Sequence, residues 1–225
     1  MGRKGFTLAE ILITLTVIGI VAALTIPTLL QNTNQAELKT ALKREFADLQ
    51  QATLLIKNDN GGSLVNAFRN STGDLKDSEN LKNAYKAKLS YIKECSGDPT
   101  YGGSGTGASA EGCWHVQWKK LNGTSINPMN YPGLILSNGT LMWFYIYSST
   151  CSFSSGAYYR CGGIYFDING FKQPNVIGKD IFIVYVTDDE LIPAGARSYC
   201  VPDDPDCGCL PTAEGYGCTA KYLYE

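Results

Sequence analysis

The sequence contains few of the residues on which enzyme chemistry usually depends. His115 is the only histidine in the 225-residue chain, and no G-x-S-x-G or H-E-x-x-H motif is present. Cys113 lies two residues before His115 in a predicted loop, but no third residue is placed to orient such a pair for nucleophilic catalysis. We therefore expect no catalytic residues and a protein that is not an enzyme.

An excess of positive charge is also absent. The chain has 19 basic and 21 acidic residues, so it has no general attraction for nucleic acid. From Asp188 to the end of the sequence there are eight acidic and two basic residues, which argues against DNA as a partner of this tail. The glycine-rich segment 96–112 lacks the G-x-G-x-x-G pattern, because Ala108 occupies the position of the third glycine. A nucleotide cofactor is therefore not expected.

Cysteine is missing from the first 94 residues, and eight cysteines follow. An even number in a polar, loop-rich region predicts disulfides and an oxidising compartment. We expect one bridge between Cys95 and Cys113 and another between Cys151 and Cys161, because each pair encloses a local loop. The pairing among the last four is left open, and their spacing fits a zinc site poorly because it contains no C-x-x-C. These four are Cys200, Cys207, Cys209 and Cys218.

Charge is almost absent from residues 6–30, where Glu10 is the one charged side chain. As a helix these residues would extend about 37 Å, enough to cross a bilayer. Arg3 and Lys4 precede the segment, so the leader is expected in the cytoplasm and the rest of the chain outside it. No A-x-A-like site follows the apolar stretch, which excludes an ordinary secretory signal.

Glu10 requires a partner, because an ionisable side chain within an apolar span is costly and is usually paired or functional. No other charged residue lies in the span. The partner must therefore come from outside the segment or from a newly made amino terminus.

Residues 5–10 read Gly-Phe-Thr-Leu-Ala-Glu, behind a short basic leader and ahead of an apolar helix. This combination resembles the processing motif of type IV prepilins, a superfamily of pilins and pseudopilins. The resemblance implies that a prepilin peptidase cuts after Gly5 and methylates the new amine of Phe6. It further implies that Phe6, Glu10 and Pro27 act in assembly, with a loss of helical regularity around residues 19–27 inside a filament. Beyond residue 30 the resemblance is limited to the order of the expected parts: a long helix, a variable loop, a small sheet and a cysteine-bounded tail.

The same resemblance implies a structural subunit, a major or minor pilin, of a type IV pilus-like filament. A pseudopilin of a type II secretion system and an adhesin-like minor tip pilin are the alternatives. The expected partners are prepilin peptidase, other pilin or pseudopilin subunits in a helical homo- or hetero-filament, the inner-membrane assembly platform and membrane lipid, with no nucleic acid. The expected location is the cytoplasmic membrane, as a single-pass protein with its head outside, followed by an extracellular or periplasmic filament.

The apolar helix is expected to continue as an amphipathic helix to about Lys57. Leu38, Leu42, Phe46, Leu49 and Ile56 recur at helical spacing, and charged residues including Glu45 lie between them. Asn58 to Gly62 then supply a stop signal.

The expected division of the chain has six parts. These are a leader at 1–5, a transmembrane and assembly helix at 6–30, an amphipathic continuation at 31–57, a variable loop region at 58–130, an antiparallel sheet at 131–190 and a disulfide-rich tail at 191–225.

Strands are predicted in the second half of the chain. A hairpin is expected where Leu134–Leu136 and Leu141–Tyr147 flank Ser137-Asn138-Gly139-Thr140, with further strands at Gly163–Ile168 and Ile181–Val186. A short helix is expected within Leu75–Ile92, and the tail from Ile192 is expected to be irregular and held by cross-links. The predicted fold class is α+β: a long projecting N-terminal helix packed on a small antiparallel sheet, with a cysteine-rich tail.

A metal hypothesis comes from Asp167-Ile168-Asn169-Gly170 with Asp180 downstream. Oxygen-bearing side chains of this kind are calcium ligands, and some type II secretion pseudopilins carry calcium in their sheet region. The EF-hand spacing is not met, however, and Asp and Asn at a strand end commonly form turns. We therefore expect no cofactor, with calcium as the alternative.

Overall fold

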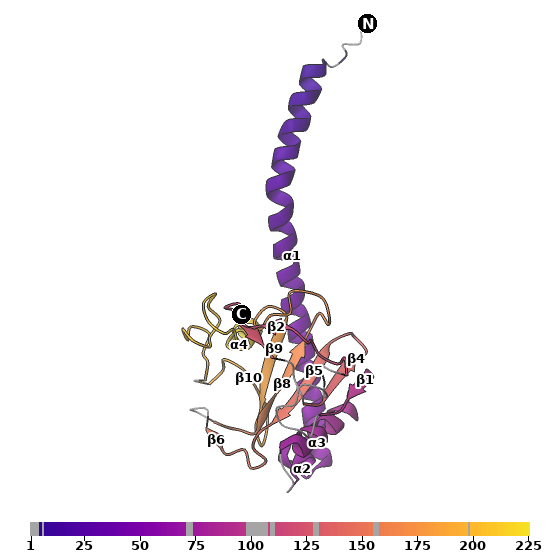
Figure 1. Cartoon of the computed structure of the whole chain (residues 1–225), viewed down its shortest axis with the longest axis vertical. Coiled ribbons are helices and arrows are strands. Elements are labelled where there is room, and N and C mark those ends of the chain that lie inside the picture. Colours follow the sequence, from indigo (N-terminus) through magenta and orange to yellow (C-terminus); the bar gives the residue numbers. More distant parts are fainter. Residues whose placement is uncertain are drawn as a thin grey trace. The chain divides into compact units, whose positions relative to one another are not determined.

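A computed structural model describes residues 5, 7–70, 74–97, 108, 111–127, 131–154, 158–197 and 199–225. The chain divides into two compact units, Met1–Thr40 and Ala41–Glu225. The first unit consists of the N-terminal part of helix α1 (Leu8–Asp59), and the second holds the rest of α1 together with an antiparallel sheet, further helices and the tail (Figure 1). The predicted α+β class with an apolar N-terminal helix is confirmed.

Helix α1 is 52 residues long and includes Pro27. It ends where Gly61 and Gly62 adopt φ angles of +70° and +89°, in the left-handed region that glycine enters without steric cost. The Gly62 N–H donates to the carbonyl of Lys57 at 2.8 Å and so closes the last turn. The stop signal predicted at Asn58 to Gly62 is therefore confirmed.

The second part of α1 buries most of the predicted apolar stripe. Leu42, Leu49 and Ile56 are at most 1 % exposed, and Phe46 packs at the edge of the same cluster. Glu45 was expected among the solvated charged residues, but this expectation is wrong: its side chain is buried with 3 % exposure. Glu45 turns inward because it lies beside the stripe and meets polar groups of the sheet, as described below.

The segment after α1 contains α2 (Val65–Phe68) and α3 (Asp74–Lys86). The helix predicted within Leu75–Ile92 is present, but it stops at Lys86, and Ile92 belongs to strand β1 (Tyr91–Cys95). This strand pairs with β4 (Gly133–Leu136), so Cys95 lies opposite Gly133. Helical spacing alone could not reveal this, because the strand is specified by a partner some 40 residues further along.

The main sheet has six strands in the order β1-β4-β5-β8-β9-β10, and all neighbours are antiparallel. The four predicted strands correspond to β4, β5 (Leu141–Ile146), β8 (Gly162–Asp167) and β9 (Ile181–Val186), and β1 and β10 (Leu191–Pro193) extend the sheet at its two edges. The predicted β4–β5 hairpin is confirmed: Gly139 has φ +90°, and Asn138 Oδ1 accepts the Thr140 N–H at 3.0 Å.

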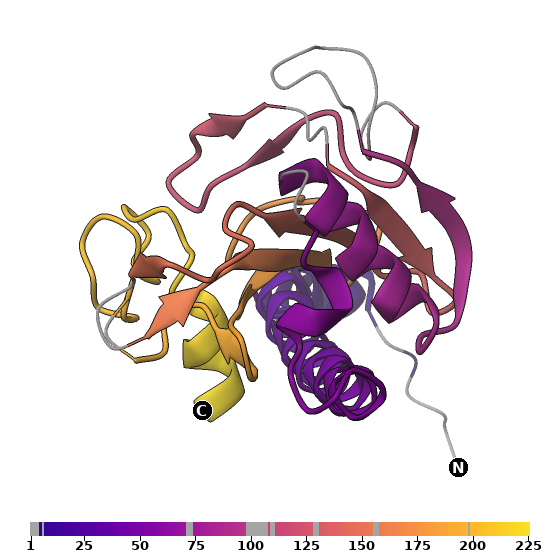
Figure 2. The same ribbon diagram turned by 90° about the horizontal axis from the view of Figure 1, so that it is seen from below.

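Both faces of the sheet are buried. On one face Phe144, Phe166 and Phe182 pack with residues of α1 and α3. On the other face Trp143 and Ile183 pack with Trp114 and with side chains of the segments that carry the small hairpins. These are β2 (Trp118–Lys119) with β3 (Ser125–Ile126), and β6 (Phe153–Ser154) with β7 (Tyr159–Arg160). Figure 2 shows α1 and α4 (Cys218–Tyr224) on one side of the sheet and the β2–β3 hairpin on the other.

The tail is more than a cross-linked coil. Ala194 and Ala213 are fully buried, and Ala220 of α4 is 3 % exposed. The Thr219 hydroxyl accepts the Ile183 N–H at 3.1 Å, and the Ala220 N–H donates to the Ala194 carbonyl at 2.9 Å. The expectation that cross-links alone hold the tail is therefore wrong, because α4 packs on β9 and forms part of the core.

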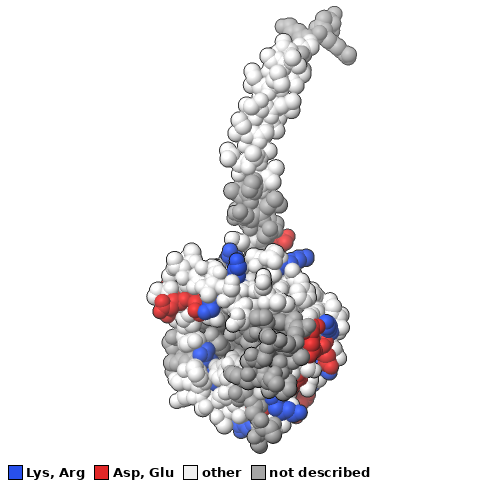
Figure 3. Space-filling model, viewed as in Figure 1, with Lys and Arg blue, Asp and Glu red and all other residues white. Residues whose placement is uncertain are grey.

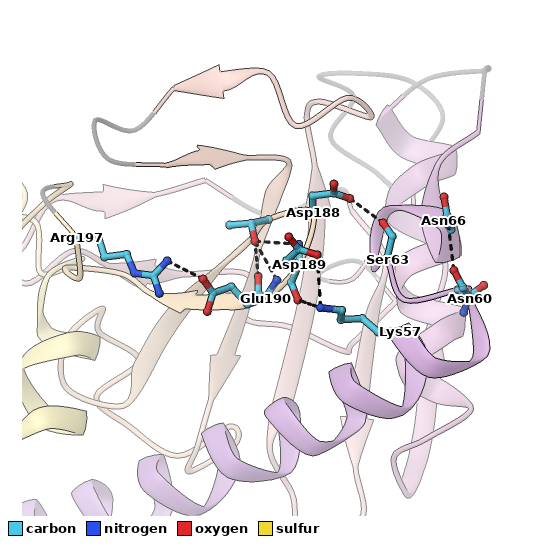
Figure 4. Close-up of polar contacts among 9 residues, drawn as sticks. Lys57, Asn60, Ser63, Asn66, Asp188, Asp189, Glu190 and Arg197 are labelled. Atoms are coloured by element: carbon cyan, nitrogen blue, oxygen red, sulfur yellow. Dashed lines mark hydrogen bonds and ion pairs between the residues drawn. The ribbon is translucent and has the colours of Figure 1, made fainter.

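The end of α1 is joined to the β9–β10 turn by polar contacts (Figure 4). Lys57 Nζ donates to the Asp189 carbonyl at 2.6 Å, and Ser63 Oγ donates to Asp188 Oδ1 at 2.7 Å. Glu190 accepts from Arg197 at 2.6 Å on the far side of the turn. Since these groups are largely exposed, each contact contributes little stability. Together they join the C-terminal end of α1 to the β9–β10 turn.

Candidate processing and assembly site

The first described residues form a start signal for α1. Thr7 Oγ1 accepts the Glu10 N–H at 3.3 Å, while Glu10 Oε2 accepts both the Thr7 N–H and the Thr7 hydroxyl at 2.8 Å. This reciprocal arrangement is a capping box, in which a Thr and a Glu three residues later satisfy free N–H groups of the first turn. Gly5 is exposed directly before it. Phe6 lies outside the described residues.

The capping box was missed at the sequence level, although Thr7-x-x-Glu10 is readable as the signal for one. The search for a Glu10 partner considered only charged groups. In the structure Glu10 caps the first turn of the helix. The same side chain places a carboxylate in the apolar segment. Within the described part of the chain only its Oε2 atom receives hydrogen bonds, so Oε1 is open to a further donor.

The helix that follows exposes apolar side chains on every side. Leu8–Ile26 is the described segment that is long and apolar enough to cross a membrane, by length and composition. Eleven large aliphatic side chains within it, among them Ile11 and Leu24, are between 46 % and 76 % exposed. On the face shown in Figure 3 this segment displays no Lys, Arg, Asp or Glu. A surface of this kind requires lipid or other apolar helices around it.

Polar groups within this segment are satisfied by the helix itself. The hydroxyls of Thr14, Thr16 and Thr25 each donate to the carbonyl four residues earlier, at 2.7–3.0 Å. Such back-bonding makes threonine compatible with a hydrocarbon environment. Pro27 has no N–H to donate to the Ala23 carbonyl, which weakens the helix locally. The loss of regularity expected at residues 19–27 concerns the filament and stays a prediction.

All eight cysteines are paired in disulfides. The two predicted bridges, Cys95–Cys113 and Cys151–Cys161, are present. The pairing that the sequence left open is Cys200–Cys207 and Cys209–Cys218, which excludes a zinc site built from these four thiolates. The bridges lie in the unit that begins at Ala41, and they indicate that this unit matures in an oxidising compartment.

The residues of the calcium hypothesis lie together at the end of β8. Asp180 accepts the N–H groups of Asn175 and Val176 at 2.8 and 2.7 Å, and Asp167 Oδ1 accepts the Asn169 N–H at 3.0 Å. These oxygens therefore already have protein donors. Among the described residues no group of three or more His, Cys, Asp and Glu side chains is arranged to hold a metal ion. Calcium stays an untested alternative.

His115, the only histidine, contacts the same region. Its Nε2 atom lies 2.7 Å from Oδ2 of Asp167, and both side chains are buried. Cys113 is bonded to Cys95 and is not a thiol that the histidine could activate. The pair therefore links the segment around Trp114 to the end of β8.

Comparison with known proteins finds a match for the N-terminal segment. Residues 1–26 match the family described as the prokaryotic N-terminal methylation motif, which is the signature of type IV pilins and pseudopilins. No curated protein and no solved structure matches the chain significantly. The motif supports a type IV pilin-like or pseudopilin protein, and proteins of this type are usually structural rather than enzymatic. It implies processing by prepilin peptidase and assembly with other pilins.

Proposed function

We propose that this chain is a structural subunit, a major or minor pilin, of a type IV pilus-like filament. The observation that carries the proposal is the capped apolar helix: Gly5 lies exposed before it, Thr7 and Glu10 start it, and aliphatic side chains cover its surface as far as Ile26. Such a helix suits insertion first into a bilayer and then among the helices of other subunits.

In the proposed topology the chain crosses the cytoplasmic membrane once. Arg3 and Lys4 stay in the cytoplasm, and the unit that begins at Ala41 lies outside, where its four disulfides form. Prepilin peptidase then removes residues 1–5 and methylates Phe6. The assembly platform of the inner membrane extracts the subunit into the filament.

Glu10 has two tasks in this proposal. Its Oε2 atom caps the helix, and its free Oε1 atom receives the Phe6 amine of the neighbouring subunit. Desolvation offsets most of the gain from this pair, so its main effect is on register. A neighbour in the wrong register leaves unpaired charges in an apolar core, at a cost of several kcal/mol.

The direct test is to shear the cells and look for the chain in the released surface filaments. A pilin is expected there as a cut, methylated, disulfide-bonded protein. The chain is not a pilin if it stays in the envelope fraction while secretion of a type II substrate depends on it; that result identifies a pseudopilin. An uncut chain that stays in the membrane in the presence of active prepilin peptidase contradicts both assignments.

A further inference from the structure

Glu45 is a buried carboxylate with only one of its two oxygens satisfied. Its Oε2 atom accepts the Asn138 Nδ2 group at 2.8 Å and the Thr140 hydroxyl at 3.0 Å, so it ties the β4–β5 turn to α1. Its Oε1 atom is buried and has no hydrogen-bond partner in the described part of the chain. A buried carboxylate oxygen without a donor is an unfavourable arrangement that a cation from outside the subunit would relieve.

Glu45 lines a surface cavity of about 380 Å³ within the unit that begins at Ala41. Its walls are one side of α1, the α3–β1 turn and the β4–β5 turn, and the charged residues on them are Arg44, Asp48 and Lys88. The rim is apolar where Leu55, which is 47 % exposed, stands beside the 67 % exposed Leu54. The cavity therefore combines a buried acid with an exposed apolar edge.

The basic side chains of the cavity are already paired with other acids. Arg44 Nε lies 4.0 Å from Asp48 Oδ2, and Lys88 forms an ion pair with Asp59. Burial raises the pKa of Glu45, and the hydrogen bonds from Asn138 and Thr140 oppose this rise; among the charged neighbours Asp48 raises the pKa and Arg44 lowers it. Among the described residues, no cation forms an ion pair with Glu45 or donates to its Oε1 atom.

Lys43 is the complementary group on the same helix. Its side chain is exposed and makes no hydrogen bond or ion pair with the described residues. It cannot reach its own Glu45 readily, because residues two apart on a helix point in different directions. It is free to meet the acid of another copy.

We propose that the Glu45 cavity is a contact between subunits, in which the ammonium group of Lys43 from a second copy of this chain donates to Glu45 Oε1. The inference rests on the proposed function. If the Phe6 amine of one copy meets Glu10 of the next, the copies are offset by four residues, or about 6 Å along the helix. A single screw operation relates identical subunits, so the same axial offset applies at every residue.

If α1 of the second unit also runs along the filament axis, this offset brings residue 43 of the incoming copy level with residue 47 of the first. Glu45 is then only two residues, or about 3 Å, away along the axis. The flexible four-carbon stem of lysine spans such a distance easily. The exposed Leu55 side chain at the edge of the cavity, together with the exposed Leu54 next to it in sequence, provides an apolar surface for the same neighbour.

The test uses full-length chains that carry Glu45→Gln, Lys43→Gln, both changes together, or Lys43→Arg. Glutamine keeps the contacts with Asn138 and Thr140 but removes the charge, so all variants are expected to fold, to be cut and to stay in the membrane. Each glutamine variant is expected at about one tenth of the normal level in sheared filaments, and the double variant at no less. Lys43→Arg is expected to assemble normally, and Asp203→Asn, which removes an exposed acid outside the cavity, serves as the control.

Carbodiimide treatment of filaments, which joins a carboxylate to an amine in contact with it, supplies a second readout. In filaments assembled from a mixture of ¹⁵N-labelled and unlabelled subunits, a mixed-isotope peptide linking Lys43 to Glu45 is expected, and it should be lost in Lys43→Arg. Normal assembly of both glutamine variants overturns the proposal. So does a double variant whose loss from the sheared filaments equals the product of the two single losses. If EDTA disperses the filaments and the Lys43→Gln variant assembles normally, the partner of Glu45 is a divalent cation and the proposal is overturned. Absence of the unaltered chain from every filament instead contradicts the proposed function.

Discussion

The Oδ2 atom of Asp167 lies 2.7 Å from Nε2 of His115 inside the second unit, where Asp167 is fully buried. Burial raises the pKa of Asp167 from 3.8 to about 6, the hydrogen bond from His115 opposes this rise, and Asp180 adds to it. The folded protein therefore binds this proton more tightly than the unfolded chain does. The contribution of Asp167 to the free energy of unfolding falls as the pH rises from about 4 to 6 and stays low above pH 6.

Asp167→Asn is expected to remove this pH dependence. Relative to the unaltered protein, the variant should gain stability between pH 4 and 6, by up to about 3 kcal/mol from the size of the pKa difference. Urea unfolding of the full chain in detergent across this range measures the effect. Asp203→Asn removes an exposed carboxylate and is the control. Parallel stability curves for Asp167→Asn and the unaltered protein would show that the buried carboxyl does not titrate in this range.

Glu10→Val separates assembly from processing. Since the change removes the carboxylate but keeps the segment apolar, the chain is expected to be cut after Gly5 and to stay in the membrane, yet to be missing from filaments. Thr7→Val is the matched variant: it removes the capping hydroxyl, at a cost of about 1 kcal/mol at the helix start, but keeps Glu10. This variant should enter filaments. Accumulation of uncut Glu10→Val chains would identify Glu10 as a recognition feature of the peptidase instead.

Gly5→Leu is expected to block maturation. A Cβ atom at Gly5 meets nothing within 4 Å, so a larger side chain there does not disturb the fold of the subunit itself. Failure of cleavage would therefore reflect the fit of the chain to the peptidase. Intact-mass measurement should find the unaltered protein beginning at a methylated Phe6 and the variant beginning at Met1. An unaltered chain that keeps Met1 while prepilin peptidase is active would refute the predicted cleavage.

Two neighbouring glycines of β8 should respond very differently to alanine. A Cβ atom at Gly162 would lie 1.9 Å from the Tyr145 carbonyl oxygen and 2.8 Å from the Ile146 Cα atom, so β5 and β8 would have to separate. We expect Gly162→Ala to cost about 3 kcal/mol or more. At Gly163 the nearest atom is the Val184 carbonyl oxygen at 3.4 Å, an ordinary contact. Thermal unfolding should show Gly163→Ala close to the unaltered protein; equal losses at both positions would contradict this close approach.

Removal of the Cys151–Cys161 bridge is expected to destabilise the second unit. Both residues are buried in the core beside the sheet, and the loop that they close is ten residues long. The chain-entropy argument gives about 3 kcal/mol for such a closure. The double variant Cys151→Ser with Cys161→Ser should show this loss in urea unfolding. Peptide mapping of the unreduced protein checks all four pairs, and free thiols at these two positions would contradict the pairing.

Local signals in the sequence predicted local structure well. Asn138-Gly139 specified a turn because its backbone conformation depends on those two residues, and Gly61-Gly62 ended α1 for the same reason. The apolar period likewise predicted Leu42, Leu49 and Ile56 as core. The disulfides Cys95–Cys113 and Cys151–Cys161 were predictable because each closes a short loop.

Features that depend on distant parts of the chain were not predictable. Ile92 fitted a helical pattern, and only pairing with β4 makes it part of a strand. Glu45 has charged neighbours in sequence, and its burial depends on Asn138 and Thr140, more than 90 residues away. The second buried face of the sheet was missed because Trp114 and Trp118, which cover it, come from a segment with little regular structure. At the candidate site, the capping role of Glu10 was readable from Thr7, whereas its partner in a filament is not.

The four disulfides follow one another along the chain without nesting or crossing. Counted along the sequence, the first cysteine is bonded to the second, the third to the fourth, the fifth to the sixth and the seventh to the eighth. The pairs are 95 with 113, 151 with 161, 200 with 207 and 209 with 218. This consecutive pattern is one of 105 possible pairings of eight cysteines. If the part of the chain that follows the membrane helix is exported in sequence order, every second cysteine that emerges finds its native partner as the only unpaired thiol already outside. The order of export can therefore specify the bridges, and no reshuffling of mispaired cysteines is needed before the subunit is complete.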